Sequence, residues 1–281
     1  MSIINPYRFA AAAGGGNLPT SIEYMLVGGG GSAGSSTHTS GGAGGGEVVV
    51  QTAEVVSATT YVIDPGAGGA GVAFNAFGSS GNDGEDTTGF GATTSNANAS
   101  GSPNYGYGGA SSKTIDDSET TYGGGTGGTG AITGSGGGAG SGANGVAASS
   151  PVAYGGAGGA GYSSSIEGSP NNYGGGGGGG SHTTFCQAGG AGGGGNGASS
   201  STAGPQIDGS PNTGGGGGGG HSGYFAGSNI APGAGGSGVV VISYAKGSLS
   251  EPTVDVWAED LSDDDNYIYK WTGLGSIEWT D

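Results

Sequence analysis

Two unbroken runs of seven glycines, Gly174–Gly180 and Gly214–Gly220, constrain this chain more than any other feature. A glycine run has no side chains to bury, and glycine loses about 0.5–1 kcal/mol more than alanine when it is ordered. Every amide and carbonyl of an ordered run must therefore find a partner in a neighbouring segment. Extended helices with three residues per turn, packed side by side, provide such partners, and each run would then span about 22 Å.

The stretch from Gly28 to Gly238 holds most of the 77 glycines, and an apolar segment flanks it on each side. Ile22–Val27 precedes it and Val239–Tyr244 follows it. Both segments are rich in β-branched and other apolar residues, which favours strands. We expect the two strands to pair, so that both ends of the glycine region lie on one small sheet.

Composition alone leaves a disordered acidic linker open as an alternative. Leu, Ile, Val and Phe make up about one residue in seven, and the formal net charge is −17. Such values are typical of disordered chains. Two features argue for folding: charged residues are sparse at 9 %, and the apolar residues are clustered in short runs as strands require.

Charge and cysteine content exclude several classes of function. Four basic residues oppose 21 acidic ones, so we expect no nucleic-acid partner and no binding to anionic membranes. No apolar run approaches the length of a transmembrane helix, so we expect no membrane insertion. The first residues do not have the pattern of a secretion signal. Cys186 is the single cysteine, which excludes an intrachain disulfide framework.

Three regions differ in composition: a short arm at 1–20, a glycine-rich domain at 21–247 and a tryptophan-rich C-terminal β module at 248–281. We expect a mostly β and irregular fold, in which a small antiparallel sheet brackets a sandwich of packed polyglycine-II helices. Strands are predicted at Glu47–Val56 and Thr59–Ile63, joined as a hairpin at Ser57-Ala58. A second hairpin is predicted around Gly273-Leu274-Gly275, between strands at 266–272 and 276–280.

A repeated unit supports the sandwich. Gly-Ser-Pro-Asn occurs at 101–104, 168–171 and 209–212, and the last two copies lead into the seven-glycine runs. Each run is followed by a polar and aromatic segment that contains a histidine. The predicted unit is thus a turn, a glycine rod and a polar tip, with loops rich in Ser, Thr, Asn and Tyr between rods.

Four sequence patterns resemble the glycine-rich domain of bacteriophage tail-fibre and related virion proteins. They are Tyr24-Met25-Leu26-Val27-Gly28-Gly29-Gly30-Gly31, Tyr61-Val62-Ile63-Asp64-Pro65-Gly66-Ala67-Gly68-Gly69, Gly84-Glu85-Asp86-Thr87-Thr88-Gly89-Phe90-Gly91 and Gly235-Gly236-Ser237-Gly238-Val239-Val240-Val241-Ile242-Ser243-Tyr244. The chain is also similar to the receptor-binding adhesins at the tips of T-even-type phage fibres. This resemblance implies a sandwich of polyglycine-II helices and host attachment through the loops between them. The arm at 1–20 and the tryptophan-rich C-terminus depart from the pattern.

The loops beside the rods hold the candidate receptor-binding residues, because aromatic rings suit binding surfaces. These are Tyr105, Tyr107, Tyr122, Tyr154, Tyr162, Tyr173, His182, Phe185, His221, Tyr224 and Phe225. The alternative is that these rings cap the rod ends and cover the sandwich. We expect no catalytic residue, no cofactor and no metal site: the histidines are too few for a triad, and no Lys follows a Gly-rich loop in Walker fashion. Whether the acidic loop at 260–266 binds calcium stays open.

We therefore expect a virion protein and not an enzyme, of the tail-fibre or adhesin type, that presents loops to a host-surface glycan or protein. The arm at 1–20 and the C-terminal module would contact other virion proteins or copies of this chain, with a homotrimer as the assembly usual for fibres. A purely structural fibre or capsid-decoration protein is the main alternative. An ice-binding protein is a third, since packed glycine helices can present a flat face.

Overall fold

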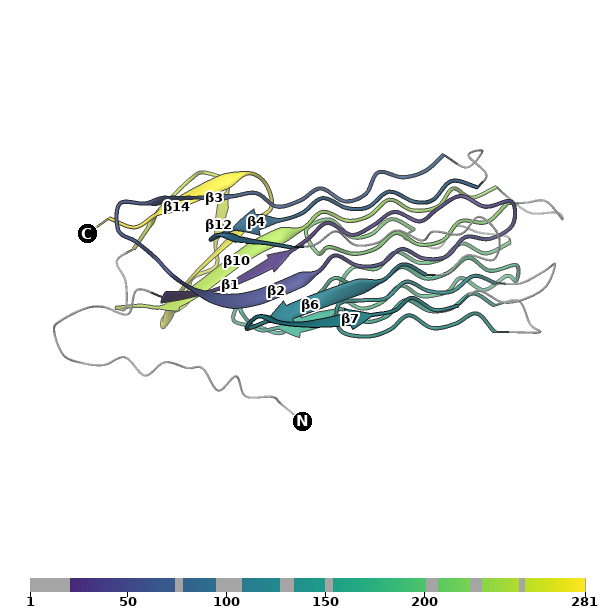
Figure 1. Ribbon diagram of the computed structural model, residues 1–281, viewed down its shortest axis with the longest axis horizontal. Helices are drawn as coiled ribbons and strands as arrows, with labels where there is room; N and C mark the ends of the chain where they lie inside the picture. The colour runs from purple at the N-terminus through teal and green to yellow at the C-terminus, as the bar shows by residue number, and fades with distance from the viewer. Residues whose placement is uncertain are drawn as a thin grey trace.

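The computed structural model describes residues 21–73, 78–94, 108–126, 134–149, 154–200, 207–222, 229–247 and 251–280. The predicted arm at 1–20 lies outside them. Figure 1 shows an elongated molecule, in which β-sheets form one end and extended rods run side by side to the other end. We call the sheet end the base and the opposite end the tip. In the described part there is no helix, so none that could cross a membrane, and the fold is mostly β and irregular.

A seven-stranded mixed sheet forms most of the base. In spatial order its strands are β12 (Ala258–Asp260), β13 (Asn266–Trp271), β10 (Val239–Ala245), β1 (Ser21–Val27), β2 (Val48–Glu54), β6 (Ser111–Ile115) and β7 (Ser118–Tyr122). Neighbouring strands are antiparallel except β2 and β6. The expected pairing of the two flanking strands is confirmed, with Tyr24 opposite Ile242.

A three-stranded sheet packs beside the large one. It consists of β11 (Thr253–Val254), β14 (Gly275–Glu278) and β3 (Thr60–Ile63) in this order. Two small hairpins complete the strands, namely β4 (Thr88–Gly89) with β5 (Ala92–Thr93), and β8 (Tyr162–Ser164) with β9 (Asn171–Tyr173). Both β6–β7 and β8–β9 lie in segments that the sequence predicted as loops.

Both hairpins predicted from the sequence are wrong. The chain does turn at Ala58, where φ is 55°, but β2 pairs with β1 and β6 whereas β3 pairs with β14. In the same way, β13 joins the large sheet and β14 the small one. The reason is the core between the sheets, which needs apolar residues from both layers. The predicted division of the chain at residue 247 stays a prediction, while β12 and β13 continue the sheet begun by β1 and β10.

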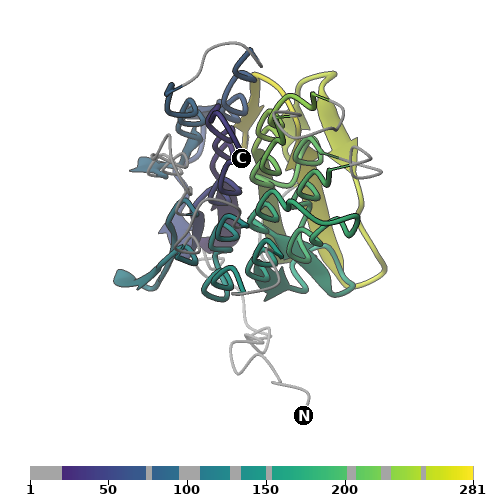
Figure 2. The same cartoon turned by 90° about the vertical axis from the view of Figure 1, so that its right-hand side faces the viewer.

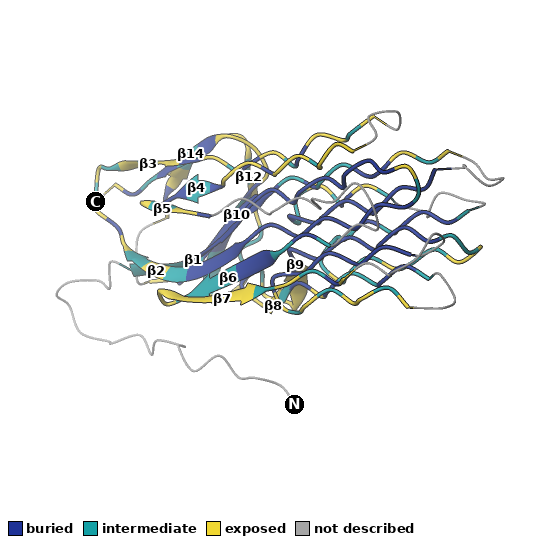
Figure 3. Cartoon of the chain, turned by 45° about the vertical axis from the view of Figure 1, so that its right-hand side comes forward, coloured by how far each residue is buried: buried dark blue, intermediate teal, exposed yellow. Residues whose placement is uncertain are grey.

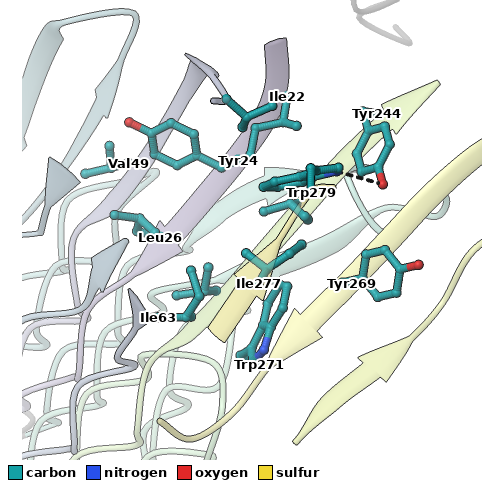
Figure 4. Close-up of a cluster of buried hydrophobic side chains, with 13 residues drawn as sticks. Ile22, Tyr24, Leu26, Val49, Ile63, Tyr244, Tyr269, Trp271, Ile277 and Trp279 are labelled. Carbon is teal, nitrogen blue, oxygen red and sulfur yellow. Dashed lines mark hydrogen bonds between the residues drawn. The ribbon is translucent and has the colours of Figure 1, made fainter. Parts of the chain in front are cut away.

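Alternating side chains of the central strands supply two apolar clusters, one on each face of the large sheet. On β1, Tyr24 and Leu26 point into the cluster between the two sheets, and Met25 and Val27 point to the opposite face. Figure 4 shows the inter-sheet cluster, where Trp271 and Trp279 pack among aliphatic side chains. The Trp279 indole donates a hydrogen bond of 3.2 Å to the Tyr244 hydroxyl. The base is therefore held by a conventional side-chain core.

The rods are held differently, by backbone hydrogen bonds that repeat every third residue. In the run 174–180, every third amide donates to the same neighbouring rod. The donor and acceptor pairs are Gly177 to Ala43 and Gly180 to Ser40 on one neighbour, Gly175 to Gly192, Gly178 to Gly195 and Ser181 to Ala198 on a second, and Gly176 to Gly159 and Gly179 to Gly156 on a third. This period corresponds to three residues per turn, and seen end-on in Figure 2 each rod has a triangular outline.

The carbonyls of the same run repeat the pattern toward three other rods. They accept from Ser141, Gly138 and Ser135 on one, from Gly216 and Gly219 on a second, and from Gly190 on a third. The run 174–180 is thus bonded to six neighbours, as in a hexagonal lattice. Its residues are buried, and Figure 3 shows the buried rods in the middle of the bundle with exposed residues along its outside.

Close approach of the backbones explains why these positions are glycine. A Cβ added at Gly177 would lie 2.0 Å from the carbonyl oxygen of Gly217, and one at Gly179 would lie 2.0 Å from that of Ser135. Real Cβ atoms essentially never approach below 3.0 Å. Glycine is therefore required at the closest contacts between rods.

Candidate functional site

The rods end together at the tip, where three polar segments from distant parts of the chain meet. They are residues 35–40, 181–187 and 221–222, the last paired with Ile230. The bridge between Thr39 and His221 joins the first and third segments, and His221 exchanges two backbone hydrogen bonds with Ile230, of 3.0 and 2.8 Å. Each segment begins where a glycine-rich rod finishes, so the lattice decides which segments become neighbours.

Three histidines gather at this point. His182 Nδ1 lies 3.3 Å from His221 Nε2, so that one ring donates a proton and the other accepts it. The ring of His182 also lies edge-on to the ring of His38, with the centroids 5.9 Å apart. His182 and His221 were predicted from the sequence as candidate binding residues, whereas His38 was not, although Thr37-His38-Thr39 also lies between two glycine-rich rods.

The surroundings of His182 keep it neutral. Burial lowers the pKa of His182 to about 4, with His221 and His38 adding smaller contributions of the same sign. Its Nε2 atom is buried and has no hydrogen-bond partner among the described residues. His182 therefore enters the tip as an uncharged ring with one unused polar atom.

Hydroxyl groups fix the backbone around the histidines. Ser222 donates its backbone amide to the carbonyl of His38 at 2.6 Å and its hydroxyl to the carbonyl of Thr37. The hydroxyls of Thr39 and Ser135 are 2.8 Å apart in a buried position. These contacts tie the tip to the rods beneath it, so the histidine cluster rests on a stiff frame.

An aromatic pair lies in the loops beside this frame. Tyr154 and Phe185 have ring centroids 5.9 Å apart with the planes tilted by 59°. The Phe185 side chain is 61 % exposed, which is high for an aromatic ring without a binding role. The structure thus brings Tyr154, His182, Phe185 and His221 to one end of the molecule, and their role in receptor binding stays a prediction.

Three further predicted residues lie at the base instead. Tyr122 is on β7, Tyr162 on β8 and Tyr173 on β9, separated from the tip by the length of the rods. Tyr173 is 3 % exposed and donates its hydroxyl to Glu167 at 2.6 Å, and burial is the main cause of its raised pKa. Lys113 lies over the rings of Tyr122 and Tyr162. These rings pack on the protein itself, and Tyr105, Tyr107, Tyr224 and Phe225 lie outside the described residues.

A shallow groove of about 380 Å³ lies at the base between the β4–β5 hairpin and the large sheet. Phe90 forms its aromatic wall and has a positive φ of 54°, rare for a phenylalanine. The ring is held between Tyr24 and Tyr61, with both centroid distances 5.4 Å. This groove was not predicted from the sequence, because the pairing of β4 with β5 was not predicted either.

The described part of the chain has no candidate site for a metal ion. No group of three or more His, Cys, Asp or Glu side chains there is placed to hold a metal ion. In the acidic loop at 260–266, Asp263 accepts backbone amides from Asp265 at 2.9 Å and Asn266 at 2.7 Å, and these bonds lower its pKa. That carboxylate shapes a turn. The tip offers stacking and hydrogen bonding, which is the chemistry of a binding surface.

Comparison with families of known proteins gives a match over most of the chain. A family model described as a glycine-rich domain matches residues 11–245. No curated protein and no solved structure matches the chain. The matched range includes β1 to β10, almost all of the rods and the three segments of the tip.

Proposed function

This chain belongs to the glycine-rich domain family, and from that premise we propose that it is a bacteriophage virion protein of the tail-fibre or adhesin type, whose tip binds a host-surface glycan or protein. The observation that carries the proposal is the gathering of Tyr154, His182, Phe185 and His221 at the free end of a rigid bundle. Binding, and not catalysis, is its role.

The rods serve as the scaffold in this proposal. We regard them as polyglycine-II helices packed as a sandwich, because amides three residues apart bond to the same neighbour and the run 174–180 has six bonded neighbours. Such a lattice needs few apolar side chains, which accounts for a low content of large hydrophobic residues. It also holds the loops at the tip in fixed relative positions, which lowers the entropy lost on binding.

The tip has the composition of a recognition surface. Phe185 provides an exposed ring for stacking, and the neutral His182 provides a polar atom that has no partner in the described structure. Serine and threonine hydroxyls surround both residues. Sugars and polar protein loops both fit this chemistry, so the proposal covers either class of host receptor.

The base faces the rest of the particle in this arrangement, through contacts with other virion proteins or with copies of this chain. The localisation that follows is the virion. A purely structural fibre or decoration protein is the second candidate, and the extensive backbone bonding of the rods favours it equally. The two differ in whether the tip binds anything.

Binding to bacterial cells separates the two candidates. Fluorescently labelled protein would be applied to a panel of bacterial strains, and Phe185→Ser would be compared with wild type on each strain that binds. Tyr122→Ser at the base is the matched control, since it also removes one aromatic ring. We expect the Phe185 variant to lose binding and the control to keep it. Equal binding by both variants, or none by wild type on any strain, favours the structural alternative.

A further inference from the structure

The charged residues of this chain are distributed unevenly along it. The sequence holds four basic and 21 acidic residues, and none of them falls in the three segments that form the tip. Each of these segments belongs to a longer stretch without charge, because the sequence has no Asp, Glu, Lys or Arg at 24–46, 168–207 or 209–245. The tip therefore carries no carboxylate, ammonium or guanidinium group of its own three segments.

The charges lie on the base and beside the rods. Lys113 is on β6, Lys270 is on β13 and Lys246 directly follows β10. Asp208 lies part-way along the rods, since the Ile207 carbonyl before it accepts the Gly218 amide at 2.7 Å. A rod of seven residues spans about 22 Å, whereas charges are screened over about 8 Å at physiological ionic strength. The charges of the base therefore act only weakly at the tip.

The histidine pair at the tip adds no positive charge at His182. Burial lowers the pKa of this ring to about 4. The hydrogen bond between His182 and His221 also needs one unprotonated nitrogen as its acceptor. A charged receptor group would consequently lose water at the tip without gaining an opposite charge. An anionic receptor would in addition approach a protein with a net charge of −17.

The exposed ring at the tip is held in a fixed position. The Phe185 amide donates to the Thr183 hydroxyl at 3.3 Å, and the Ser200 hydroxyl donates to the Thr183 carbonyl at 3.0 Å. Tyr154 packs beside the ring, with the centroids 5.9 Å apart. Because the loop is already ordered, little conformational entropy is lost when a receptor packs on Phe185.

A fixed aromatic ring among hydroxyl groups, without charges, matches the chemistry of uncharged sugars. The C–H face of a sugar ring packs on an aromatic ring, and its hydroxyls exchange hydrogen bonds with serine and threonine. Protein interfaces are usually centred on several apolar anchors, whereas Phe185 is the only large apolar side chain of the three described tip segments. We propose that the receptor of the tip is an uncharged glycan. This inference rests on the proposed function and specifies the class of receptor.

Opposite charges placed at the tip test the proposal on the full chain, with a bacterial strain that binds wild type. Thr184 is exposed beside Phe185, and it would be replaced in the variants Thr184→Lys and Thr184→Glu. With an uncharged receptor, both variants should lower the affinity by similar factors of about two- to tenfold, because each charge loses water without gaining a partner. Stronger binding by one variant and weaker binding by the other would show a charged receptor and overturn the proposal.

The matched controls are Thr121→Lys and Thr121→Glu, at an exposed threonine on β7 at the base. Both should bind as wild type does, and far-ultraviolet circular dichroism should show that all four variants keep their fold. Equal losses in the tip and base variants would show that the tip is not the contact, and would overturn the proposal.

Polysaccharide from the same strain separates the receptor classes directly. It would be released by mild acid and divided by anion exchange into an unretained neutral fraction and a retained acidic fraction. The neutral fraction should compete with cells for labelled protein, and competition by the acidic fraction alone, or by neither, would overturn the proposal. Loss of binding after treatment of the cells with proteinase K would indicate a protein receptor and overturn it as well. Absence of wild-type binding on every strain would instead defeat the proposed function, and this inference with it.

Discussion

Replacing Gly177 with alanine probes the lattice at its most crowded point. The new Cβ would lie 2.0 Å from the Gly217 oxygen, whereas ordinary contact begins at 3.4 Å, so the two rods must separate by about 1.4 Å. That movement breaks the bonds from Gly216 to Gly175 and from Gly219 to Gly178, each now 2.8 Å. Because the groups are buried, losing both bonds should lower the free energy of unfolding by about 3–5 kcal/mol.

Gly123→Ala is the matched control. It also lies in a glycine-rich segment, but a Cβ there would have no heavy atom within 4 Å. This substitution should leave stability unchanged or raise it by up to about 1 kcal/mol, through the lower entropy of the unfolded chain. Urea denaturation followed by circular dichroism measures both variants, and thermal melting should place Gly177→Ala about 10 °C below the control.

The result that would refute the reasoning is equal stability of the two variants. Gly177→Ala would then have to fit between rods that are as close as the structure places them, which a Cβ at 2.0 Å does not permit. A large loss in Gly123→Ala would be equally damaging, since no packing contact explains it. The comparison therefore tests close packing itself and not the general cost of changing a glycine.

Three further predictions concern side chains. The pKa of His182 is lowered from 6.5 to about 4, so the unfolded state binds a proton at a higher pH than the folded state does. The free energy of unfolding should therefore be highest above about pH 6.5 and fall by about 1–2 kcal/mol as the pH drops toward 4. Urea titrations at several pH values should show that His182→Asn removes this loss. The largely buried Glu167 carboxylate forms an ion pair of 2.8 Å with the Lys270 ammonium, so Glu167→Gln should lower the free energy of unfolding by about 2–4 kcal/mol in urea denaturation. An unchanged free energy of unfolding would contradict a stabilising role for this ion pair. Trp279→Phe removes the hydrogen bond to Tyr244 and leaves a cavity, for an expected loss of about 2–3 kcal/mol in thermal melting; unchanged melting would show that the core repacks.

The rods could be predicted from the sequence because their signal is local. A run such as Gly174–Gly180 has few ordered conformations open to it, and the repeated Gly-Ser-Pro-Asn turn sets where runs begin. Strands with dense apolar character, such as β1 and β10, were found for the same reason. Their pairing followed because both lie directly beside the glycine region.

Strand partners elsewhere could not be predicted, because long-range packing decides them. Residues of β2 and β3 are close in sequence and suited to a hairpin, but Val49 and Ile63 enter the same core from different sheets. Similarly, Trp271 and Ile277 meet in that core although β13 and β14 do not pair. A turn predicted from local sequence does not show which of the two sheets the next strand will join.

The candidate site was predicted in part for a related reason. The residues at the ends of the seven-glycine runs, His182 and His221, were identified because they follow a recognisable rod. Their contact with His38, far away in sequence, depends on which rods are neighbours in the lattice, and that order is not written in any local pattern. The sequence did not distinguish the base tyrosines, Tyr162 and Tyr173, from residues at the tip, because a loop beside a rod can lie at either end of it.

The two ends of the molecule are stabilised by different means, and this bears on how the tip can change. Bonds between rods use backbone atoms, so a substitution at Phe185 or Thr183 alters no contact of the run 174–180. The side-chain core that holds the sheets lies at the far end, around Leu26 and Trp271. A tip sequence can therefore vary at little cost to the scaffold, which is the property that the proposed receptor-binding role would require.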